Sequence, residues 1–185
     1  MTYPIFIKHL KGYIRNQYLD FLVKNGYETK QFYKYALKYS RKIFLYKNGV
    51  NIEGIIGFSN TISLEKDIRR ASYPILYIKF IYCKDKQLFE LMITNIIKYA
   101  VDNNIPRIFI QHSILYDNIL INLEFDKGYC GDNCVNESIC LICYNNPYNY
   151  EPYSYFKDVL DEKSYRTIYC KEYDPNKLYD SYDDF

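Results

Sequence analysis

Apolar residues recur along the chain in helical and strand-like patterns that predict a defined order of elements. Residues 4 to 10 resemble a first strand. Two helical patterns follow at residues 14 to 24 and 28 to 39, and Asn25-Gly26 between them ends the first helix. Residues 42 to 64 alternate as a hairpin, in which Asn48-Gly49 is the pair typical of a type I′ turn.

The middle of the chain contains a strand–helix–strand unit. Pro74 opens the run ILYIKFIY, whose consecutive apolar residues are typical of a strand buried on both faces. A helix is predicted at residues 86 to 103, and its apolar stripe comprises Phe89, Met92, Ile93, Ile96, Ile97 and Ala100. Pro106 prevents the helix from continuing, and residues 107 to 111 form the next apolar strand. Two strands joined in this way pair in parallel through a right-handed crossover.

The last third of the chain is less regular. A helix is predicted at about residues 115 to 126, followed by a cysteine-bearing segment with the strand-like run SICLICY. We expect one domain at residues 1 to 146, and a Tyr/Asp-rich C-terminal tail at residues 147 to 185 that is partly packed on it. The predicted fold class is α/β (α+β), with a mixed, mostly antiparallel sheet, a central parallel strand pair and helices on both faces.

Composition narrows the choice of partner. The chain of 185 residues has a net charge of +2, too small to require a nucleic acid or a membrane. The abundance of tyrosine, 24 residues, is typical of a protein from an AT-rich genome. The tyrosines are spread along the chain, which does not favour a stacking surface for single-stranded nucleic acid. No segment resembles a signal peptide or a membrane span, so we expect a cytoplasmic protein with reduced thiols.

The charge is unevenly distributed. Residues 146 to 185 carry nine acidic and five basic residues, so the tail is −4 and the remaining chain is +6. A basic body suits an anionic ligand such as a phosphorylated cofactor, and a solvated surface explains it equally well.

The run ILYIKFIYCKDKQLFELMITNIIKYAVDNNIPRIFIQHS, followed by NLEFDKGY, resembles the GNAT superfamily of N-acetyltransferases. The resemblance covers about residues 4 to 145. It implies a GNAT-like fold and transfer of an acyl group from acetyl-CoA to an amine. In that family the two parallel strands separate at their C-terminal ends, and the cofactor arm lies between them. On this sequence those ends are residues 79 to 82 and 111 to 113.

The resemblance implies a cofactor-binding segment with an altered phosphate loop. The residues concerned are Phe80, Ile81, Tyr82, Lys84, Lys86, Gln87 and Leu88. The family's loop pattern is Q/R-x-x-G-x-G/A, and here Cys83 occupies the first position while Lys86 and Leu88 occupy the two small-residue positions. Glycine lets main-chain N–H groups approach a pyrophosphate at a helix N-terminus. The helix N-terminus and its free N–H groups are still expected, and Lys84 and Lys86 could add direct phosphate contacts, so cofactor binding here would be remodelled.

The resemblance also implies catalytic candidates. His112 would lie beside the gap between the strands and act as the general base; an ordinary surface histidine is the alternative. The family pattern LYEKLGF, which carries a tyrosine acid, corresponds to LEFDKGY here. Either Glu124 or Phe125 occupies the acid position, depending on the alignment, and only Glu124 could transfer a proton. Tyr116 and Tyr129 are nearby substitutes.

Four cysteines suggest a different site. Cys130, Cys134, Cys140 and Cys143 have the spacing C-x3-C-x5-C-x2-C, and four thiolates could bind zinc. The central spacing is short for a zinc ribbon, and we favour free cysteines and no metal. Cys83, at a helix N-terminus, is either a low-pKa thiol or a small apolar filler.

These observations leave two main hypotheses of function. The first is a divergent acetyl-CoA-dependent N-acetyltransferase whose partners are an acyl-CoA and an unidentified amine. The second is a catalytically inactive GNAT-like protein that binds another protein, for example through its C-terminal tail. A zinc-clipped adaptor is a third, weaker alternative.

Overall fold

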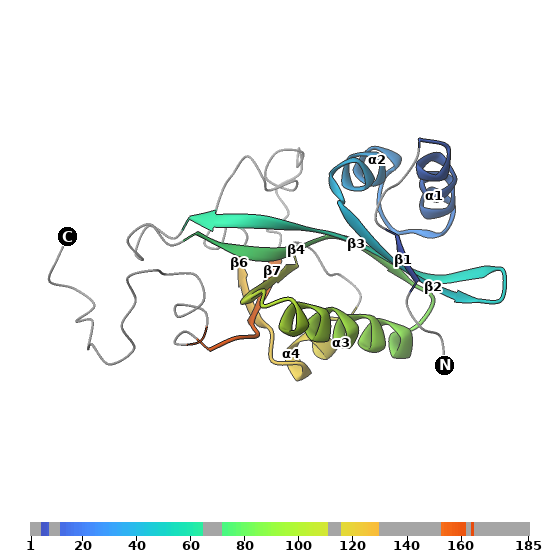
Figure 1. Cartoon of the computed structure of the whole chain (residues 1–185). Helices are drawn as coiled ribbons and strands as arrows, with labels where there is room; N and C mark the ends of the chain where they lie inside the picture. Colours follow the sequence, from blue (N-terminus) through green and yellow to red (C-terminus); the bar gives the residue numbers. More distant parts are fainter. Residues whose placement is uncertain are drawn as a thin grey trace, which may run out of the picture.

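The computed structural model describes residues 5–7, 12–64, 72–110, 116–129, 153–161 and 164. The described strands form one seven-stranded sheet in the order β1-β2-β3-β4-β5-β7-β6 (Figure 1). The elements along the chain are β1 (Ile5–Ile7), α1 (Gly12–Asn25), α2 (Lys30–Tyr39), β2 (Lys42–Asn48), β3 (Asn51–Leu64), β4 (Ser72–Cys83), α3 (Lys86–Asp102), β5 (Arg107–Ile110), α4 (Asp117–Asn122), β6 (Asp126–Tyr129) and β7 (Tyr153–Asp158).

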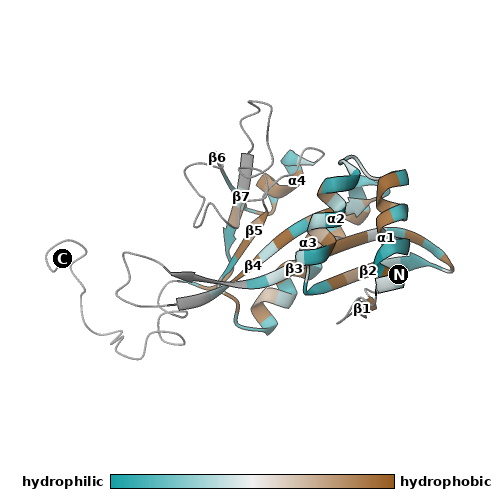
Figure 2. Cartoon of the chain, turned by 90° about the horizontal axis from the view of Figure 1, so that it is seen from above, coloured by the Kyte–Doolittle hydropathy of each residue, from teal (hydrophilic) through white to brown (hydrophobic). Residues whose placement is uncertain are grey.

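Every neighbouring pair of strands is antiparallel except β4 and β5, which are parallel. Helices α1 and α2 cover one face of the sheet, and α3 and α4 cover the other (Figure 1). This arrangement confirms the predicted mixed sheet with a central parallel pair. Apolar residues run through the central strands β4 and β5 (Figure 2), as the pattern of ILYIKFIY predicts.

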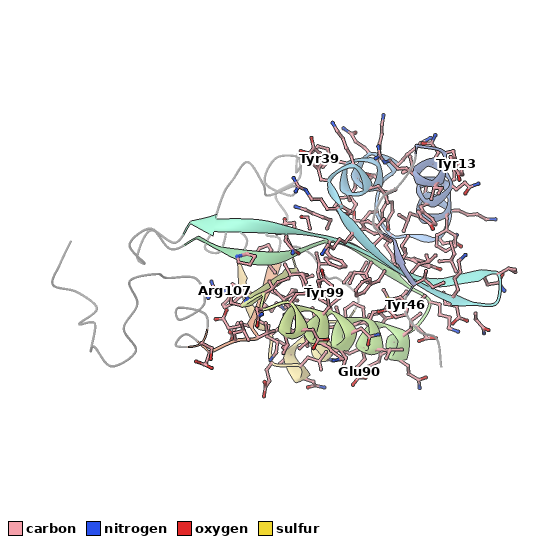
Figure 3. The ribbon with its side chains drawn as sticks, viewed as in Figure 1. Tyr13, Tyr39, Tyr46, Glu90, Tyr99 and Arg107 are labelled. Carbon is pink, nitrogen blue, oxygen red and sulfur yellow. The ribbon has the colours of Figure 1, made fainter. Side chains whose placement is uncertain are left out.

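The two larger cores formed by the described residues lie on opposite faces of the sheet, and Ile75, Tyr77 and Phe109 form a third, small cluster. The larger one is beneath α3, where the predicted stripe is buried except for Ile97, which is partly buried and packs against the others. The smaller one joins α1 and α2 to the sheet through Leu22, Tyr33, Ala36, Leu37 and residues of β2 to β4. Tyr46 and Tyr99 lie between α3 and the sheet, whereas Tyr13 and Tyr39 point outward from α1 and α2 (Figure 3).

The hairpin between β2 and β3 is present, but its turn lies one residue further along than predicted. Asn48 pairs with Asn51, so the central turn residues are Gly49 and Val50. Among these, Gly49 has a φ of +61°. Positive φ at the first central residue is typical of a type II′ turn, where glycine is preferred. The predicted type I′ turn centred on Asn48-Gly49 was therefore wrong.

The greatest difference from the sequence analysis concerns β7. Tyr153–Asp158 falls in the predicted tail, yet it forms a strand inserted between β5 and β6. The predicted helix at 115 to 126 is also shorter, because residues 126 to 129 form β6. The run SICLICY and most of the predicted tail lie outside the described residues, so the domain division at residue 146 stays a prediction. No helix in the described part of the chain is long and apolar enough to span a bilayer.

Candidate functional site

The two parallel strands stop pairing while β4 continues. Their register runs from Ile75 opposite Arg107 to Ile78 opposite Ile110. Beyond Ile78, β4 extends to Cys83, and within the described ranges those residues pair only with β3. The main chain of residues 79 to 83 therefore has an edge on its β5 side that no described strand covers.

A β-bulge marks the point of separation. Ile78 pairs with Phe58 and Phe80 pairs with Gly57, so Lys79 is an extra residue in β4. A bulge bends its strand and increases the local twist. It also changes the face to which the following side chains belong, since Phe80 and Tyr82 pack against the α1–α2 core while Cys83 packs beneath α3.

The corner between β4 and α3 is closed by its own aspartate. Asp85 is the N-cap of α3, and its carboxylate accepts a hydrogen bond of 2.8 Å from the Leu88 N–H. An aspartate here stabilises the helix by satisfying a main-chain donor and by opposing the helix dipole. It also occupies an N–H group and adds a negative charge where a phosphate would bind.

The side chains of this corner point in different directions. Leu88 is buried in the core beneath the sheet, so it does not fill the position of an approaching phosphate. Lys86 and Gln87 are exposed, and their main-chain N–H groups make no hydrogen bond to any described residue. These two N–H groups are what remains of the helix N-terminus as an anion-binding surface.

Lys84 is already paired with a carboxylate. Its Nζ lies 2.6 Å from Glu53 Oε1 and 3.9 Å from Asp85 Oδ2. The hydrogen bond to Glu53 raises the pKa of the Lys84 ammonium, so this side chain stays charged. Its main-chain N–H also donates to the Glu53 carbonyl at 2.9 Å. Glu53 is thus a structural partner of the corner, and a bound phosphate would compete with it for Lys84.

Aromatic residues surround the C-terminal end of β4. The Tyr82 ring packs edge-on against Phe21 of α1, with 5.1 Å between ring centroids. On the other face, the Tyr116 ring lies 4.9 Å from that of Phe89 in the first turn of α3. Burial raises the pKa of both tyrosines, so both keep their phenolic proton at neutral pH.

Cys83 is a buried apolar filler. Its side chain belongs to the core beneath α3, and burial raises its pKa to about 12. Its burial favours the apolar filler of the two interpretations.

The two predicted catalytic residues are not brought together among the described residues. His112 lies outside them, two positions after the end of β5. Glu124 follows α4 with a φ of 61°, its side chain is 87% exposed, and it forms an ion pair of 3.1 Å with Lys157. The adjacent N–H groups of Glu124 and Phe125 donate to the Ile121 and Leu120 carbonyls, so the conformation of Glu124 closes the helix, where glycine is more usual.

The neighbouring Phe125 is buried in the core beneath the sheet. Its ring can therefore anchor α4, but it cannot carry a proton. The proposed zinc ligands Cys130, Cys134, Cys140 and Cys143 all lie outside the described residues and stay a prediction. Within the described ranges, no group of three or more His, Cys, Asp or Glu residues is placed to hold a metal ion.

Two features of this site are not predicted from the sequence. One is the bulge at Lys79, which no pattern in the sequence marks. The other is the position of Asp85, although an aspartate three residues before Leu88 is a recognisable helix N-cap signal. The contact between Lys84 and Glu53, which are 31 residues apart in the sequence, could be recognised only in the structure.

No family model and no curated protein matches the sequence. Solved structures do match the fold. An N-acetyltransferase from Staphylococcus aureus Mu50 is 16% identical, with a TM-score of 0.55 over 87% of this chain and 99% of its own. An N-acyl amino acid synthase from uncultured soil microbes is 11% identical, with a TM-score of 0.55 over 89% of this chain and 94% of its own.

The N-acetylglutamate synthase from Neisseria gonorrhoeae, complexed with coenzyme A and N-acetyl-glutamate, is 13% identical with a TM-score of 0.55. That match covers 87% of this chain and 36% of the synthase. Another similar structure is described as an acetyltransferase of the GNAT family, at 15% identity and a TM-score of 0.51. Together with the bulged β4 and the separating parallel pair, these similarities show that the chain has the GNAT fold.

Proposed function

We propose that this protein is an N-acyltransferase that transfers an acyl group from acetyl-CoA to an amine. The observation that carries the proposal is the edge of β4 from Lys79 to Cys83, with which no described strand pairs on the β5 side. An extended pantetheine arm can pair with such an edge as an added strand does. The similar structures support the same chemistry, since their names describe acetyl or acyl transfer and one was determined with coenzyme A.

The phosphates of the donor would meet a modified corner. The N–H groups of Lys86 and Gln87 and the exposed ammonium of Lys86 would bind them, while Asp85 opposes them. The pairing of Lys84 with Glu53 weakens its attraction for a phosphate, although the ammonium has further N–H donors and its side chain is 47% exposed. We therefore expect weaker affinity for coenzyme A than a glycine-lined loop provides.

The reaction requires proton transfers at the amine and at the leaving sulfur. The ammonium substrate first loses one proton to a base. The free amine nitrogen then attacks the thioester carbonyl carbon, the C–S bond breaks, and the nitrogen gives up a second proton as the amide forms, which balances the proton that the leaving thiolate takes up. As the base we propose His112, which follows the end of β5 by two positions in the sequence.

For the proton donor we propose Tyr116 rather than Glu124. Tyr116 packs on Phe89 in the first turn of α3, next to the corner between β4 and α3. Glu124 is largely exposed and already paired with Lys157. A phenol near the leaving sulfur suits a general acid, whereas the Glu124 carboxylate is turned toward Lys157.

A non-catalytic binding protein is the second candidate. The Asp85 cap and the Lys84–Glu53 pair favour it, because both oppose phosphate binding. In either case the protein is proposed to act in the cytosol, and a protein partner of the tail stays a hypothesis.

Thermal unfolding in the presence of acetyl-CoA and of free CoA separates the two candidates. The acyltransferase predicts stabilisation by both at millimolar concentration, and acetyl transfer to at least one member of a panel of primary amines. If neither ligand raises the unfolding temperature at millimolar concentration, the acyltransferase proposal is wrong and the binding protein is favoured.

A further inference from the structure

Helix α1 carries an arginine that no described residue neutralises. Arg15 is partly buried, and its Nε is shielded from solvent without a hydrogen bond, which is unusual for a buried donor. Its two Nη nitrogens also make no hydrogen bond or ion pair within the part of the chain that the structure describes. They are not among the buried atoms, so solvent reaches them. The guanidinium can therefore offer its Nη donors to an anion that approaches from solvent.

Tyr18 is the neighbour of Arg15 on the same side of the helix. Residues three positions apart are adjacent on a helix surface, with about 5–6 Å between their Cβ atoms. Tyr18 is partly buried and packs against the core that joins α1 and α2 to the sheet. Burial raises the pKa of its phenol, and the hydroxyl has no hydrogen bond to any described residue. Two adjacent polar side chains of α1 are thus without a described partner.

The surroundings of this pair favour a negatively charged ligand. The residues that pack with Tyr18 are apolar or aromatic, and they include Phe21 and Ile52. Asp20, the acidic residue of α1, is exposed and lies five positions from Arg15, on a different side of the helix. A positive charge beside an apolar surface attracts an anion more strongly than it would in water. This part of α1 is therefore suited to an oxyanion.

Helix α1 connects the pair to the end of β4. The ring of Phe21 packs edge-on against Tyr82, with 5.1 Å between the ring centroids. Arg15 precedes Phe21 in α1 by a distance of about 9 Å along the helix axis. Both polar side chains therefore lie within reach of an extended ligand that passes the end of β4 on the face covered by α1 and α2 (Figure 1).

We propose that Arg15 and Tyr18 bind an oxyanion of a ligand that lies at the end of β4, either the carboxylate of the acceptor or a phosphate of the donor. The planar guanidinium matches two oxygens of a carboxylate or a phosphate, and the Tyr18 hydroxyl adds a further donor. The identity of the ligand rests on the proposed acyltransferase function. The oxyanion site itself does not, because its occupancy can be measured with simple anions and without turnover.

Thermal unfolding of the full chain in simple salts tests the site. Sodium phosphate and sodium acetate, each at about 50 mM, are compared at neutral pH with sodium chloride of the same ionic strength. The wild type should unfold about 2–5 °C higher in the oxyanions, as mass action predicts for a site with a millimolar dissociation constant. Arg15→Gln should lose most of this stabilisation. Tyr18→Phe, which keeps the ring and its packing, should lose part of it.

Arg41→Gln is the matched control. Arg41 is exposed and follows α2, and its replacement changes the net charge equally, so this variant should respond to the anions as the wild type does. Far-ultraviolet circular dichroism checks that each variant is folded; should Arg15→Gln fail to fold, Tyr18→Phe decides by the same criterion. Equal stabilisation of wild type and Arg15→Gln overturns the site. So does a wild type that responds to oxyanions and chloride alike, as expected if water is the partner of the guanidinium.

Two titrations then identify the ligand that carries the oxyanion. Coenzyme A is titrated into wild type and Arg15→Gln, and L-leucine and L-leucinamide are titrated into each protein saturated with coenzyme A. An affinity for coenzyme A that is about tenfold lower in Arg15→Gln assigns the oxyanion to a donor phosphate. An unchanged affinity for coenzyme A, with weaker binding of L-leucine but not of L-leucinamide, assigns it to the acceptor carboxylate.

The oxyanion site and the proposed function can fail separately. Stabilisation by simple oxyanions that depends on Arg15, in a protein that binds no coenzyme A, supports the oxyanion site and contradicts the acyltransferase. Binding of coenzyme A and acetyl transfer that are the same in wild type and Arg15→Gln support the acyltransferase and contradict the role of Arg15.

Discussion

At the scale of single residues, Asp85 has two opposing effects. Its carboxylate caps α3 by accepting from the Leu88 N–H, which stabilises the fold. The same carboxylate places a negative charge at the end of β4 where donor phosphates would bind. The charge and the cap can be separated, because asparagine caps a helix about as well as aspartate does.

Asp85→Asn should therefore bind coenzyme A more tightly than the wild type, by about two- to tenfold at low ionic strength, with the gain shrinking as salt is added. The free energy of unfolding should change by less than about 0.5 kcal/mol. Isothermal titration at two salt concentrations measures the effect. Asp102→Asn, which removes the same charge at the far end of α3, should leave the affinity unchanged; equal affinities of Asp85→Asn and wild type would show that phosphates do not approach this corner.

Tyr116 permits a second test at this scale. Removing its hydroxyl in Tyr116→Phe should lower kcat by about 100-fold or more, because the leaving thiolate loses its proton donor. The KM for acetyl-CoA should stay nearly constant, since the ring and its contact with Phe89 are retained. Tyr39→Phe, at an exposed tyrosine of α2, is the control. Steady-state kinetics with a kcat like that of the wild type would exclude Tyr116 as the acid.

At the scale of elements, one carboxylate connects α4, β6 and β7. Asp117 at the start of α4 forms an ion pair of 2.8 Å with Lys127 of β6 and accepts a hydrogen bond from the Tyr155 hydroxyl of β7. These two interactions lower the pKa of Asp117 from its usual value of 3.8. A carboxyl group with a lowered folded-state pKa contributes stability above its unfolded pKa and loses that contribution as the pH falls through the folded value.

Asp117→Asn should consequently cost about 0.5–1.5 kcal/mol of unfolding free energy at pH 7. The low end of that range is expected, since the side chain is partly exposed and solvent screens the pair. Below pH 4 the wild type should lose stability more steeply than the variant, so the two stability curves converge. Urea unfolding between pH 7 and pH 3 measures both effects, and parallel curves over that range would contradict the assignment.

At the scale of the whole molecule, local sequence patterns predicted the unit β4-α3-β5 but not strand β7, which pairs with β5. The stripe of α3 and the nearly apolar run of β4 were enough to predict a parallel pair with helices on both faces. Strand β7 was missed because its pairing partners Arg107–Ile110 and Asp126–Tyr129 are distant in sequence, and because tyrosines occur at both buried and exposed positions. Tyr155 is fully buried while Tyr39 is 43% exposed, and no local period distinguishes them.

The candidate site was predictable to a similar extent. The separation of β4 from β5 at their C-terminal ends was expected from the family resemblance of the parallel pair. The loss of the phosphate-loop glycines is visible in Cys83-Lys84-Asp85-Lys86-Gln87-Leu88. The direction of each side chain in that corner was not predictable. Leu88 points into the core beneath α3. Lys84 contacts Glu53 because β3 and β4 pair in antiparallel with Gly54 opposite Cys83.

Hydrogen exchange of the β4 main chain, followed by mass spectrometry with and without acetyl-CoA, tests the central claim most directly. If an acyl-thioester arm pairs with the edge of β4 that no described strand covers, peptides containing residues 79 to 83 should exchange more slowly when acetyl-CoA is present, while those containing residues 43 to 47 of β2 should not change. Unchanged exchange at residues 79 to 83 under saturating acetyl-CoA would contradict the account.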